Sequence, residues 1–216
     1  MSDDYPHATA AAALCRLAPV VPVMVVSSAQ DAIAQARALL AGGLKALEVT
    51  LRTPSALDGI RAIRDALPDA MVGAGTVTRP ALVEAAVAAG ARFLVTPGAT
   101  DELARALRDA PVPSLPGCAT ASEAMALAAR GFRMLKFFPA EPAGGPKYLA
   151  ALAGPLADLT FCPTGGIDAA RAPAWLALPN VPCVGGSWML PKDALAAGDF
   201  ARIERLAREA AALRAG

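Results

Sequence analysis

The sequence has a single histidine, His7, and only 5% aromatic residues. Its four cysteines, Cys15, Cys118, Cys162 and Cys183, are scattered and include no Cys-x-x-Cys pair. Such a pattern supports neither a zinc site nor a disulfide framework. We therefore expect reduced, mostly buried cysteines, no metal and no cofactor. Any general acid or base must come from the carboxylates, lysines and tyrosines.

An excess of charge of one sign is also lacking. Lysine plus arginine number 20 against 19 aspartates and glutamates, and no basic run carries interleaved aromatics. This balance gives no reason to expect a nucleic acid or an anionic membrane as a partner. The apolar stretch Val20 to Val26 is too short to span a bilayer, and the chain opens on acidic rather than basic residues, Met1 to Asp4. We expect a cytoplasmic protein.

Hydrophobic residues, in contrast, are plentiful. They make up 55% of the 216 residues, and the mean hydropathy is +0.43. This length exceeds the usual size of one domain but matches a single α/β barrel. No linker, low-complexity tract or break in composition divides the chain, so we expect one domain, residues 1–216, with a deep core.

Short β-branched runs alternate with alanine-rich amphipathic stretches eight times. The predicted strands are Val20 to Val26, Ala46 to Leu51, Met71 to Val77, Phe93 to Pro97, Pro113 to Cys118, Met134 to Pro139, Thr160 to Thr164 and Cys183 to Ser187. The predicted helices between them are Ala29 to Ala41, Ser55 to Leu67, Pro80 to Ala89, Asp101 to Asp109, Ser122 to Arg130, Lys147 to Ala153, Ala169 to Leu178 and about Asp193 to Leu213. This pattern favours a closed (β/α)8 TIM barrel over an open doubly wound sheet. We expect an extra N-terminal helix, Ala10 to Leu17, to close the bottom of the barrel.

Local start and stop signals agree with this assignment. Thr120 and Glu123 have the spacing of a capping box, and Thr100 precedes two acidic residues. Gly90 and Gly131 each fall between a helical run and the next strand, as helix-ending glycines do.

The active sites of such barrels lie at the C-terminal ends of the strands. Polar residues and glycines gather at the predicted ends, which are therefore expected to converge on one mouth. They are Glu48, Thr50, Arg52, Gly75, Thr76, Thr96, Pro97, Lys136, Thr164, Gly165, Gly166, Gly185, Gly186 and Ser187.

Lys136 interrupts the apolar run from Met134 to Pro139. A lysine in a low dielectric more readily gives up its proton, and a neutral amine can attack a carbonyl to form a Schiff base. Lys136 is therefore a candidate nucleophile. The alternative is a lysine at a strand end whose stem packs and whose ammonium reaches solvent.

Glu48 lies in a strand whose alternation places Glu48, Thr50 and Arg52 on one face. In a barrel this charged face points inward, toward Lys136, where a carboxyl can move protons. The alternative is a structural salt bridge to Arg52 or Lys136.

A lysine amine beside a glutamate can carry out imine chemistry and carbon–carbon cleavage. Arg52, with Thr76 as a second donor, suits the carboxylate of a 2-oxo acid. Gly165-Gly166 and Gly185-Gly186, followed by Ser187, end the last two predicted strands, where barrels often bind phosphate through backbone N–H groups.

Segments along the whole chain resemble the bacterial 2-keto-3-deoxy-6-phosphogluconate aldolase and 4-hydroxy-2-oxoglutarate aldolase family of class I, Schiff-base aldolases. The matching segments are Pro19 to Val23, Leu47 to Thr53, Val72 to Val77, Lys136 to Glu141, Phe161 to Ile167 and Gly185 to Trp188. The resemblance implies cleavage of the phosphorylated 2-oxo sugar acid to pyruvate and glyceraldehyde 3-phosphate in the Entner–Doudoroff pathway, with side activity on 4-hydroxy-2-oxoglutarate. It also implies a homotrimer.

The resemblance assigns a role to individual residues. It implies Lys136 as the Schiff-base lysine and Glu48 as the proton shuttle. The substrate carboxylate is expected at Arg52 and Thr76, and the rest of the substrate and its phosphate at Pro97, Phe138, Thr164, Gly165, Gly166, Gly186 and Ser187. Cys118, at the end of the fifth predicted strand, departs from the family's expected pattern.

Three alternatives remain open on the sequence. The sister aldolase that acts on 2-keto-3-deoxy-6-phosphogalactonate yields the same products from the C4 epimer. A phosphosugar isomerase or epimerase could use Glu48 as a base but gives Lys136 no covalent role. A non-catalytic phosphosugar sensor is the third, although no output domain is attached to the barrel.

Overall fold

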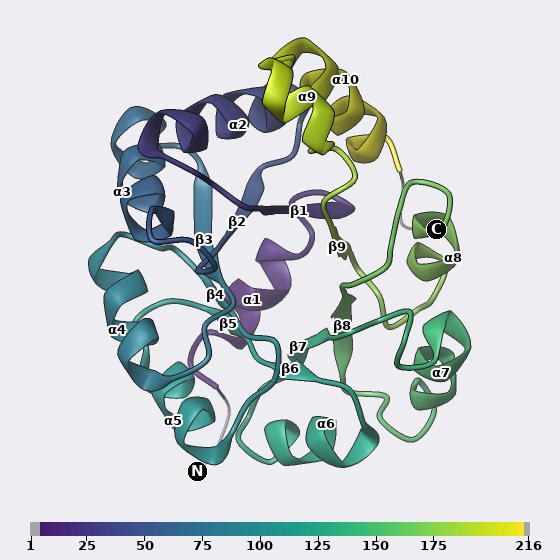
Figure 1. Cartoon of the computed structure of the whole chain (residues 1–216). Coiled ribbons are helices and arrows are strands. Elements are labelled where there is room, and N and C mark those ends of the chain that lie inside the picture. Colours follow the sequence, from purple (N-terminus) through teal and green to yellow (C-terminus); the bar gives the residue numbers. More distant parts are fainter. Residues whose placement is uncertain (1–4, 214–216) are drawn as a thin grey trace.

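The computed structural model describes residues 5–213, so the acidic start of the chain and the two ends of the expected domain lie outside the described residues. The described chain has an α/β fold with a curled parallel sheet (Figure 1). Its strands are β1 Val20–Met24, β2 Ala46–Thr50, β3 Met71–Gly75, β4 Leu94–Val95, β5 Ser114–Leu115, β6 Gly117–Cys118, β7 Met134–Phe137, β8 Thr160–Pro163 and β9 Val184–Gly186.

The strands form two hydrogen-bonded groups, one of six strands in the order β5-β4-β3-β2-β1-β9 and one of three in the order β6-β7-β8. All pairs are parallel, as the alternation of strands and helices predicts. An isolated parallel bridge between Thr164 and Gly185 lies where β8 and β9 end. The carboxyl ends of all strands therefore face the same way and gather the residues that follow them.

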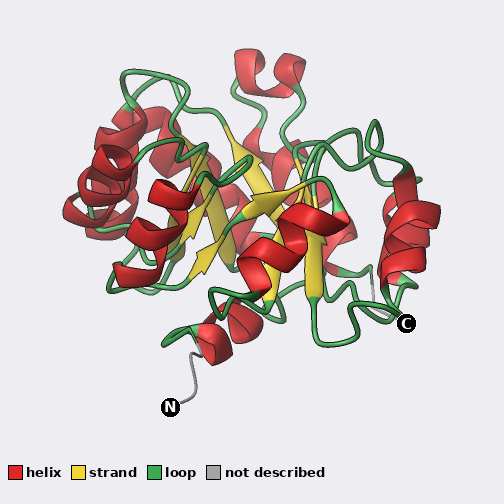
Figure 2. Ribbon diagram, turned by 90° about the horizontal axis from the view of Figure 1, so that it is seen from below, coloured by secondary structure: helices red, strands yellow, loops and turns green. Residues whose placement is uncertain are grey.

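Helices lie around the outside of the strands, and α1 lies behind their middle in Figure 1 and beyond one end of them in Figure 2. No helix among residues 5–213 is long and apolar enough to cross a membrane. The helices are α1 Ala8–Leu14, α2 Ala29–Ala41, α3 Ala56–Ala66, α4 Pro80–Ala88, α5 Asp101–Asp109, α6 Ala121–Ala128, α7 Gly145–Leu152, α8 Ala172–Leu176, α9 Lys192–Ala197 and α10 Phe200–Ala211.

The local signals in the sequence act as expected. The Thr120 hydroxyl accepts a hydrogen bond from the Glu123 N–H (3.2 Å), and the Glu123 carboxylate accepts one from the Thr120 N–H (3.0 Å). This pair forms the predicted capping box of α6. Gly90 and Gly131, just past α4 and α6, have φ values of 92° and 91°, which residues with a Cβ rarely adopt.

Two predicted elements are interrupted. The expected strand Pro113 to Cys118 divides into β5 and β6 at Pro116, which has no N–H to donate to a neighbouring strand. The expected long last helix divides into α9 and α10 at Gly198, whose φ of 65° ends the first helix. The Asp199 carboxylate then accepts from the Arg202 N–H (3.0 Å) and begins the second helix.

Other predicted boundaries differ by a few residues. The N-terminal helix is Ala8–Leu14 rather than Ala10 to Leu17, and α8 is Ala172–Leu176 rather than Ala169 to Leu178. At α8 the Asp168 carboxylate accepts from the backbone N–H groups of Ala170 and Arg171 (3.1 and 2.9 Å), which forms a turn where the helix was expected to start.

The core has two parts. The larger lies between the strands and the outer helices and includes the fully buried Trp175, Phe132 and Phe161. The smaller joins residues of α1 to residues of the strands and their flanks, and its members are Ala11, Leu14, Cys15, Val21, Ala46, Phe93, Val95, Leu115, Met134, Cys162 and Cys183. All four cysteines are buried free thiols, as the sequence indicates.

Candidate active site

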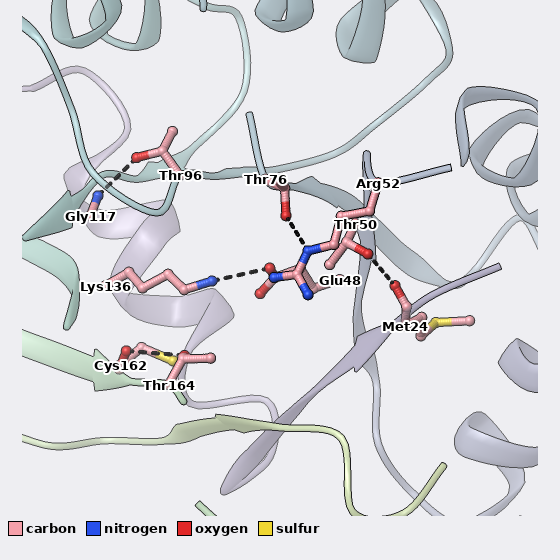
Figure 3. Close-up of polar contacts among 10 residues, drawn as sticks. All are labelled: Met24, Glu48, Thr50, Arg52, Thr76, Thr96, Gly117, Lys136, Cys162 and Thr164. Atoms are coloured by element: carbon pink, nitrogen blue, oxygen red, sulfur yellow. Dashed lines mark hydrogen bonds and ion pairs between the residues drawn. The ribbon is translucent and has the colours of Figure 1, made fainter. Parts of the chain in front are cut away.

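Lys136 on β7 and Glu48 on β2 point toward one another across the inside of the fold (Figure 3). Lys136 Nζ lies 3.2 Å from Glu48 Oε1, and the two residues are only 5% and 3% exposed. The predicted convergence of these two residues is confirmed, and the predicted alternative of a lysine that reaches solvent is wrong. A proton moved from Nζ to Oε1 leaves a neutral amine and a neutral carboxyl, the forms that imine chemistry requires.

The Glu48 carboxylate has room because its neighbour on β3 is a glycine. Gly73 pairs in register with Glu48, and Gly75, two residues further along β3, pairs with Thr50. A Cβ at Gly75 would lie 2.1 Å from Glu48 Oε1, so any side chain there would displace the carboxylate. The sequence analysis placed Gly75 at a strand end but did not predict this contact.

Arg52 and Thr76 meet at the ends of β2 and β3. Arg52 Nε donates a hydrogen bond to Thr76 Oγ1 at 3.1 Å, and the arginine is exposed. Thr76 has a φ of 59°, an unusual conformation for a β-branched residue that costs on the order of 1–3 kcal/mol. Backbone strain of this kind concentrates at functional sites, and here it accompanies a hydroxyl held beside a guanidinium.

Thr50 lies two residues after Glu48 on β2, and a backbone contact holds its side chain. Its hydroxyl donates to the Met24 carbonyl at 2.8 Å and is completely buried, which ties β2 to β1. Arg52 lies past the end of β2, so strand alternation no longer decides where its side chain points. Glu48 and Thr50 therefore share the face that strand alternation predicts, opposite Leu47 and Val49, which belong to the larger core.

Phe138 contacts the lysine, and two further predicted residues, Thr164 and Pro97, contact the strands on either side of β7. The Phe138 ring centroid lies 5.5 Å from Lys136 Nζ, within the range of a cation–π contact. Thr164 is buried, and its hydroxyl lies 3.5 Å from the Cys162 carbonyl. Pro97 is half-buried, and a Cβ at Gly117 would lie 2.4 Å from its carbonyl carbon.

The two glycine pairs end neighbouring strands. Gly165 and Gly166 have φ values of 107° and 80°, a backbone shape that other residues rarely adopt. A Cβ at Gly185 would lie 2.2 Å from Thr164 Oγ1, so the second pair packs directly against the residue before the first. Ser187 is exposed just beyond Gly186.

Metal ligands do not gather in the part of the chain that the structure describes. Residues 5–213 contain no group of three or more histidine, cysteine or acidic side chains placed to hold a metal ion. The site does contain amine, carboxyl, guanidinium and hydroxyl groups, those of Lys136, Glu48, Arg52 and Thr76.

The comparison with protein families gives this geometry a context. Residues 11–206 match the family model of the KDPG and KHG aldolases. The two abbreviations stand for 2-keto-3-deoxy-6-phosphogluconate and 4-hydroxy-2-oxoglutarate. The chain belongs to this aldolase family. The resemblance found in the sequence is thus confirmed, and an isomerase, an epimerase or a sensor no longer competes with an aldolase.

Curated relatives and solved structures of this family match nearly the whole chain. The 2-dehydro-3-deoxy-phosphogluconate aldolase of Pseudomonas aeruginosa is 51% identical over 197 residues, 91% of this chain and 90% of the relative. The KHG/KDPG aldolase of Escherichia coli K12 is 50% identical over 202 residues, 94% of this chain and 95% of the relative. The KDPG aldolase of Legionella pneumophila, solved with pyruvate captured as a covalent carbinolamine intermediate, has a TM-score of 0.92 at 42% identity and covers 94% of this chain and 98% of its own.

Cys118, the departure noted in the sequence of this aldolase, is turned to the backbone of the lysine strand. Its thiol donates to the Lys136 carbonyl at 3.6 Å. Burial raises the pKa of the Cys118 thiol to about 12, with a smaller contribution from the Glu123 carboxylate. Because the thiolate is the reactive form, Cys118 is an inert packing residue beside the site.

Two side chains near the first glycine pair were not predicted. Glu141 Oε1 accepts a hydrogen bond from Trp175 Nε1 at 2.8 Å, and the Glu141 side chain packs against Gly166. Arg171 Nη1 donates to the Gly166 carbonyl at 3.5 Å. Neither residue ends a predicted strand, so only the folded chain brings them to the site.

Proposed function

We propose that this protein is a class I aldolase that cleaves 2-dehydro-3-deoxy-6-phosphogluconate to pyruvate and glyceraldehyde 3-phosphate. The observation that carries the proposal is the buried contact between Lys136 and Glu48 at the carboxyl ends of two strands. Burial of two charges is costly, and replacing such a pair by apolar residues often stabilises a protein. A pair placed where barrels keep their active sites therefore indicates chemistry.

In the proposed mechanism, neutral Lys136 Nζ attacks the C2 ketone and forms a carbinolamine. Glu48 protonates the departing hydroxyl, water leaves, and a protonated imine remains. The Glu48 carboxylate then removes the proton of the C4 hydroxyl, the C3–C4 bond breaks to release glyceraldehyde 3-phosphate, and the electron pair of that bond moves into the imine to give an enamine. Protonation of C3 and hydrolysis release pyruvate and restore the amine. The covalent pyruvate adduct of the Legionella enzyme supports the first step by analogy.

Glu48 is the proposed carrier of these protons because its carboxyl contacts Nζ directly. Its contact with Nζ also means that the proton gained from the amine stays next to the reacting carbons. Arg52 and Thr76 are proposed to bind the substrate carboxylate, since their hydrogen bond places a guanidinium fork and a hydroxyl together.

The rest of the substrate is assigned to the surrounding residues. Pro97, Phe138 and Thr164 are proposed to line the pocket. The phosphate is assigned to the residues at the ends of β8 and β9, namely Gly165, Gly166, Gly186 and Ser187, since the Thr164–Gly185 bridge makes these ends adjacent. No metal or cofactor has a role in this proposal.

The larger-scale expectations also belong to this proposal. The continuation of β5 into β6 and the Thr164–Gly185 bridge support closure of the strands into a (β/α)8 barrel with α1 across its bottom. We propose one domain over residues 1–216, a homotrimer and a cytoplasmic location. Side activity on 4-hydroxy-2-oxoglutarate is proposed from the family name and from the relative called a KHG/KDPG aldolase.

Borohydride reduction in the presence of pyruvate tests the proposal. We expect a lactyl-sized mass on the peptide that carries Lys136 and loss of activity, because only an imine is reducible. Lys136→Ala removes both labelling and turnover, whereas the exposed Lys147→Ala control keeps both. Labelling at Lys147 or Lys45, or turnover without any trapping, would contradict the assignment.

A further inference from the structure

A small cavity lies beside the first glycine pair. Its volume is about 410 Å³, and it is lined by Pro139, Glu141, Pro142, Gly165, Gly166 and Arg171. The loop after the lysine strand β7 forms one wall, and the turn after β8 forms the other. The cavity therefore connects the proposed phosphate site with the segment that follows the proposed nucleophile.

The charges around this cavity are unbalanced without Arg171. Among the residues that line it, Glu141 is the only acid and Arg171 the only cation. The Glu141 side chain packs against Gly166, where a Cβ would lie 2.8 Å from its Cβ and Cγ. A phosphate dianion at Gly166 would thus approach a carboxylate, and a nearby positive charge is needed to offset the repulsion.

Arg171 is free to supply that charge because its present partner is exposed. Its Nη1 lies 2.6 Å from Asp168 Oδ2, and the two side chains are 56% and 46% exposed. Ion pairs at such exposure are worth roughly 0–1 kcal/mol. The Asp168 carboxylate also keeps two backbone N–H donors on its other oxygen, Oδ1, so it stays hydrogen-bonded when the guanidinium leaves.

We propose that Arg171 is a specificity-determining residue that binds the phosphate end of the substrate. The inference rests on the proposed function and adds to it a side-chain cation that the glycine and serine positions lack. In this arrangement the guanidinium turns from Asp168 to the phosphate dianion, a partner that accepts two charge-assisted hydrogen bonds from the planar fork. Its position 3.5 Å from the Gly166 carbonyl places it at the glycine turn before the substrate binds.

Steady-state kinetics with two substrates test this inference. The substrates are 2-keto-3-deoxy-6-phosphogluconate and the same sugar acid without phosphate. A contact that is equally strong in the ground and transition states raises KM when it is lost and leaves kcat unchanged, and we expect this for a cation that only holds the unreactive phosphate. For Arg171→Ala we expect KM for the phosphorylated substrate to rise by about tenfold and kcat to change by less than about twofold.

Matched variants separate charge from general disruption. Arg61→Ala removes an arginine in the same arrangement, paired at 2.6 Å with an aspartate three residues earlier, on α3 away from the cavity. We expect no change in KM for this control. Arg171→Lys keeps the charge but loses the fork, so its KM falls between those of the wild type and the alanine variant. High salt reduces the difference in KM for the phosphorylated substrate between the wild type and Arg171→Ala, because salt screens the charge of an exposed arginine.

The outcomes distinguish this inference from the proposed function. If Arg171→Ala has the KM of wild type, or raises KM equally for both substrates, the role of Arg171 is overturned. Trapping of pyruvate on Lys136 in that same variant would then show that the aldolase assignment stands. If borohydride traps no pyruvate on the wild type, the proposed function falls and the assignment of Arg171 falls with it.

Discussion

The two ends of the strands differ in chemistry although the same strands run between them. The end that carries Glu48, Lys136 and Thr76, where we propose the reaction takes place and which is here called the catalytic end, contains a buried ion pair and a strained threonine. The end covered by α1, here called the helix-covered end, contains the apolar residues Leu14 and Val21 with their neighbours. In parallel α/β folds the first end serves the reaction and the second stabilises the fold.

The cysteines follow the same division. At the helix-covered end the Cys183 thiol contacts the thiols of Cys15 and Cys162. Hydrogen bonds with these two thiols, and to a smaller extent burial, raise the pKa of Cys183 well above the ordinary value. These thiols therefore act as small apolar side chains. A change at the catalytic end should therefore alter turnover, and a change at the helix-covered end should alter the free energy of unfolding.

The largest expected effect is at the catalytic end. Glu48→Gln keeps the shape of the side chain but removes the proton carrier, so kcat should fall on the order of 10²- to 10⁴-fold. Substrate KM and the midpoint of thermal unfolding should change much less. Steady-state kinetics and calorimetry check this, and a variant that keeps its kcat but loses affinity would assign Glu48 to positioning only.

The next effect belongs to the helix-covered end. Leu14→Ala removes a side chain that is 4% exposed, and the free energy of unfolding should fall by about 2–5 kcal/mol with kcat unchanged. Leu17→Ala is the matched control, because Leu17 is 39% exposed and its loss should cost less than about 0.5 kcal/mol. Denaturant unfolding measures both variants. A fall in kcat for folded Leu14→Ala would break the division between the ends.

Gly75→Ala tests whether the free space next to Glu48 is part of the site. Its Cβ would lie 2.1 Å from Glu48 Oε1, so the carboxylate must move and its contact with Lys136 must lengthen. A displacement of about 1 Å of a group that takes part in the reaction can lower the rate by about 10²-fold, so we expect kcat to fall by about that factor. Gly154→Ala is the control, because a Cβ there meets no atom within 4 Å. Equal kcat values for the two variants would show that Glu48 tolerates displacement.

The smallest effect concerns Cys118. Its pKa of about 12 in the folded protein exceeds the value of about 8.5 in an unfolded chain. The unfolded chain therefore loses the thiol proton first as pH rises, and the stability contributed by the protonated thiol, complete below about pH 8.5, declines from there toward pH 12. At pH 8 we expect iodoacetamide to alkylate Cys118 only in denaturant, as peptide mass mapping would detect. Rapid labelling of the native protein would contradict the burial of this thiol.

Local sequence signals predicted much of the fold. The capping box at Thr120, the glycines at the helix ends and the alternation of strands and helices all act over a few residues, so one segment is enough to read them. The division of the last helix also had a local signal, since Gly198 ends α9 and Asp199 caps α10. The sequence nevertheless predicted one helix from about Asp193 to Leu213, because the helical pattern of apolar residues continues across Gly198 and Asp199.

The residues of the site also fall into those that the sequence predicted and those that it did not. Lys136 and Glu48 were predictable because each is a charged residue within an apolar strand, and parallel strands bring their ends together. Thr50 shares the face of Glu48 as alternation predicts, whereas Arg52 lies past the end of β2, where its hydrogen bond to Thr76 rather than alternation fixes its side chain. Glu141 could not be predicted, because its contact with Gly166 joins two segments that no periodicity relates. Arg171 follows Gly166 closely in the chain, but it lies in a turn, where no periodicity predicts the direction of a side chain.

The sequence by itself determined the alternation of strands and helices, the family and the two residues proposed for the chemistry. These follow from short-range periodicity and from the cost of placing charge in an apolar strand. Tertiary structure alone decided the 3.2 Å contact between Lys136 and Glu48, the space that Gly75 leaves for it, and the packing of Glu141 against Gly166. Such contacts depend on distances between segments far apart in the chain, and packing fixes those distances only when all the segments are in place.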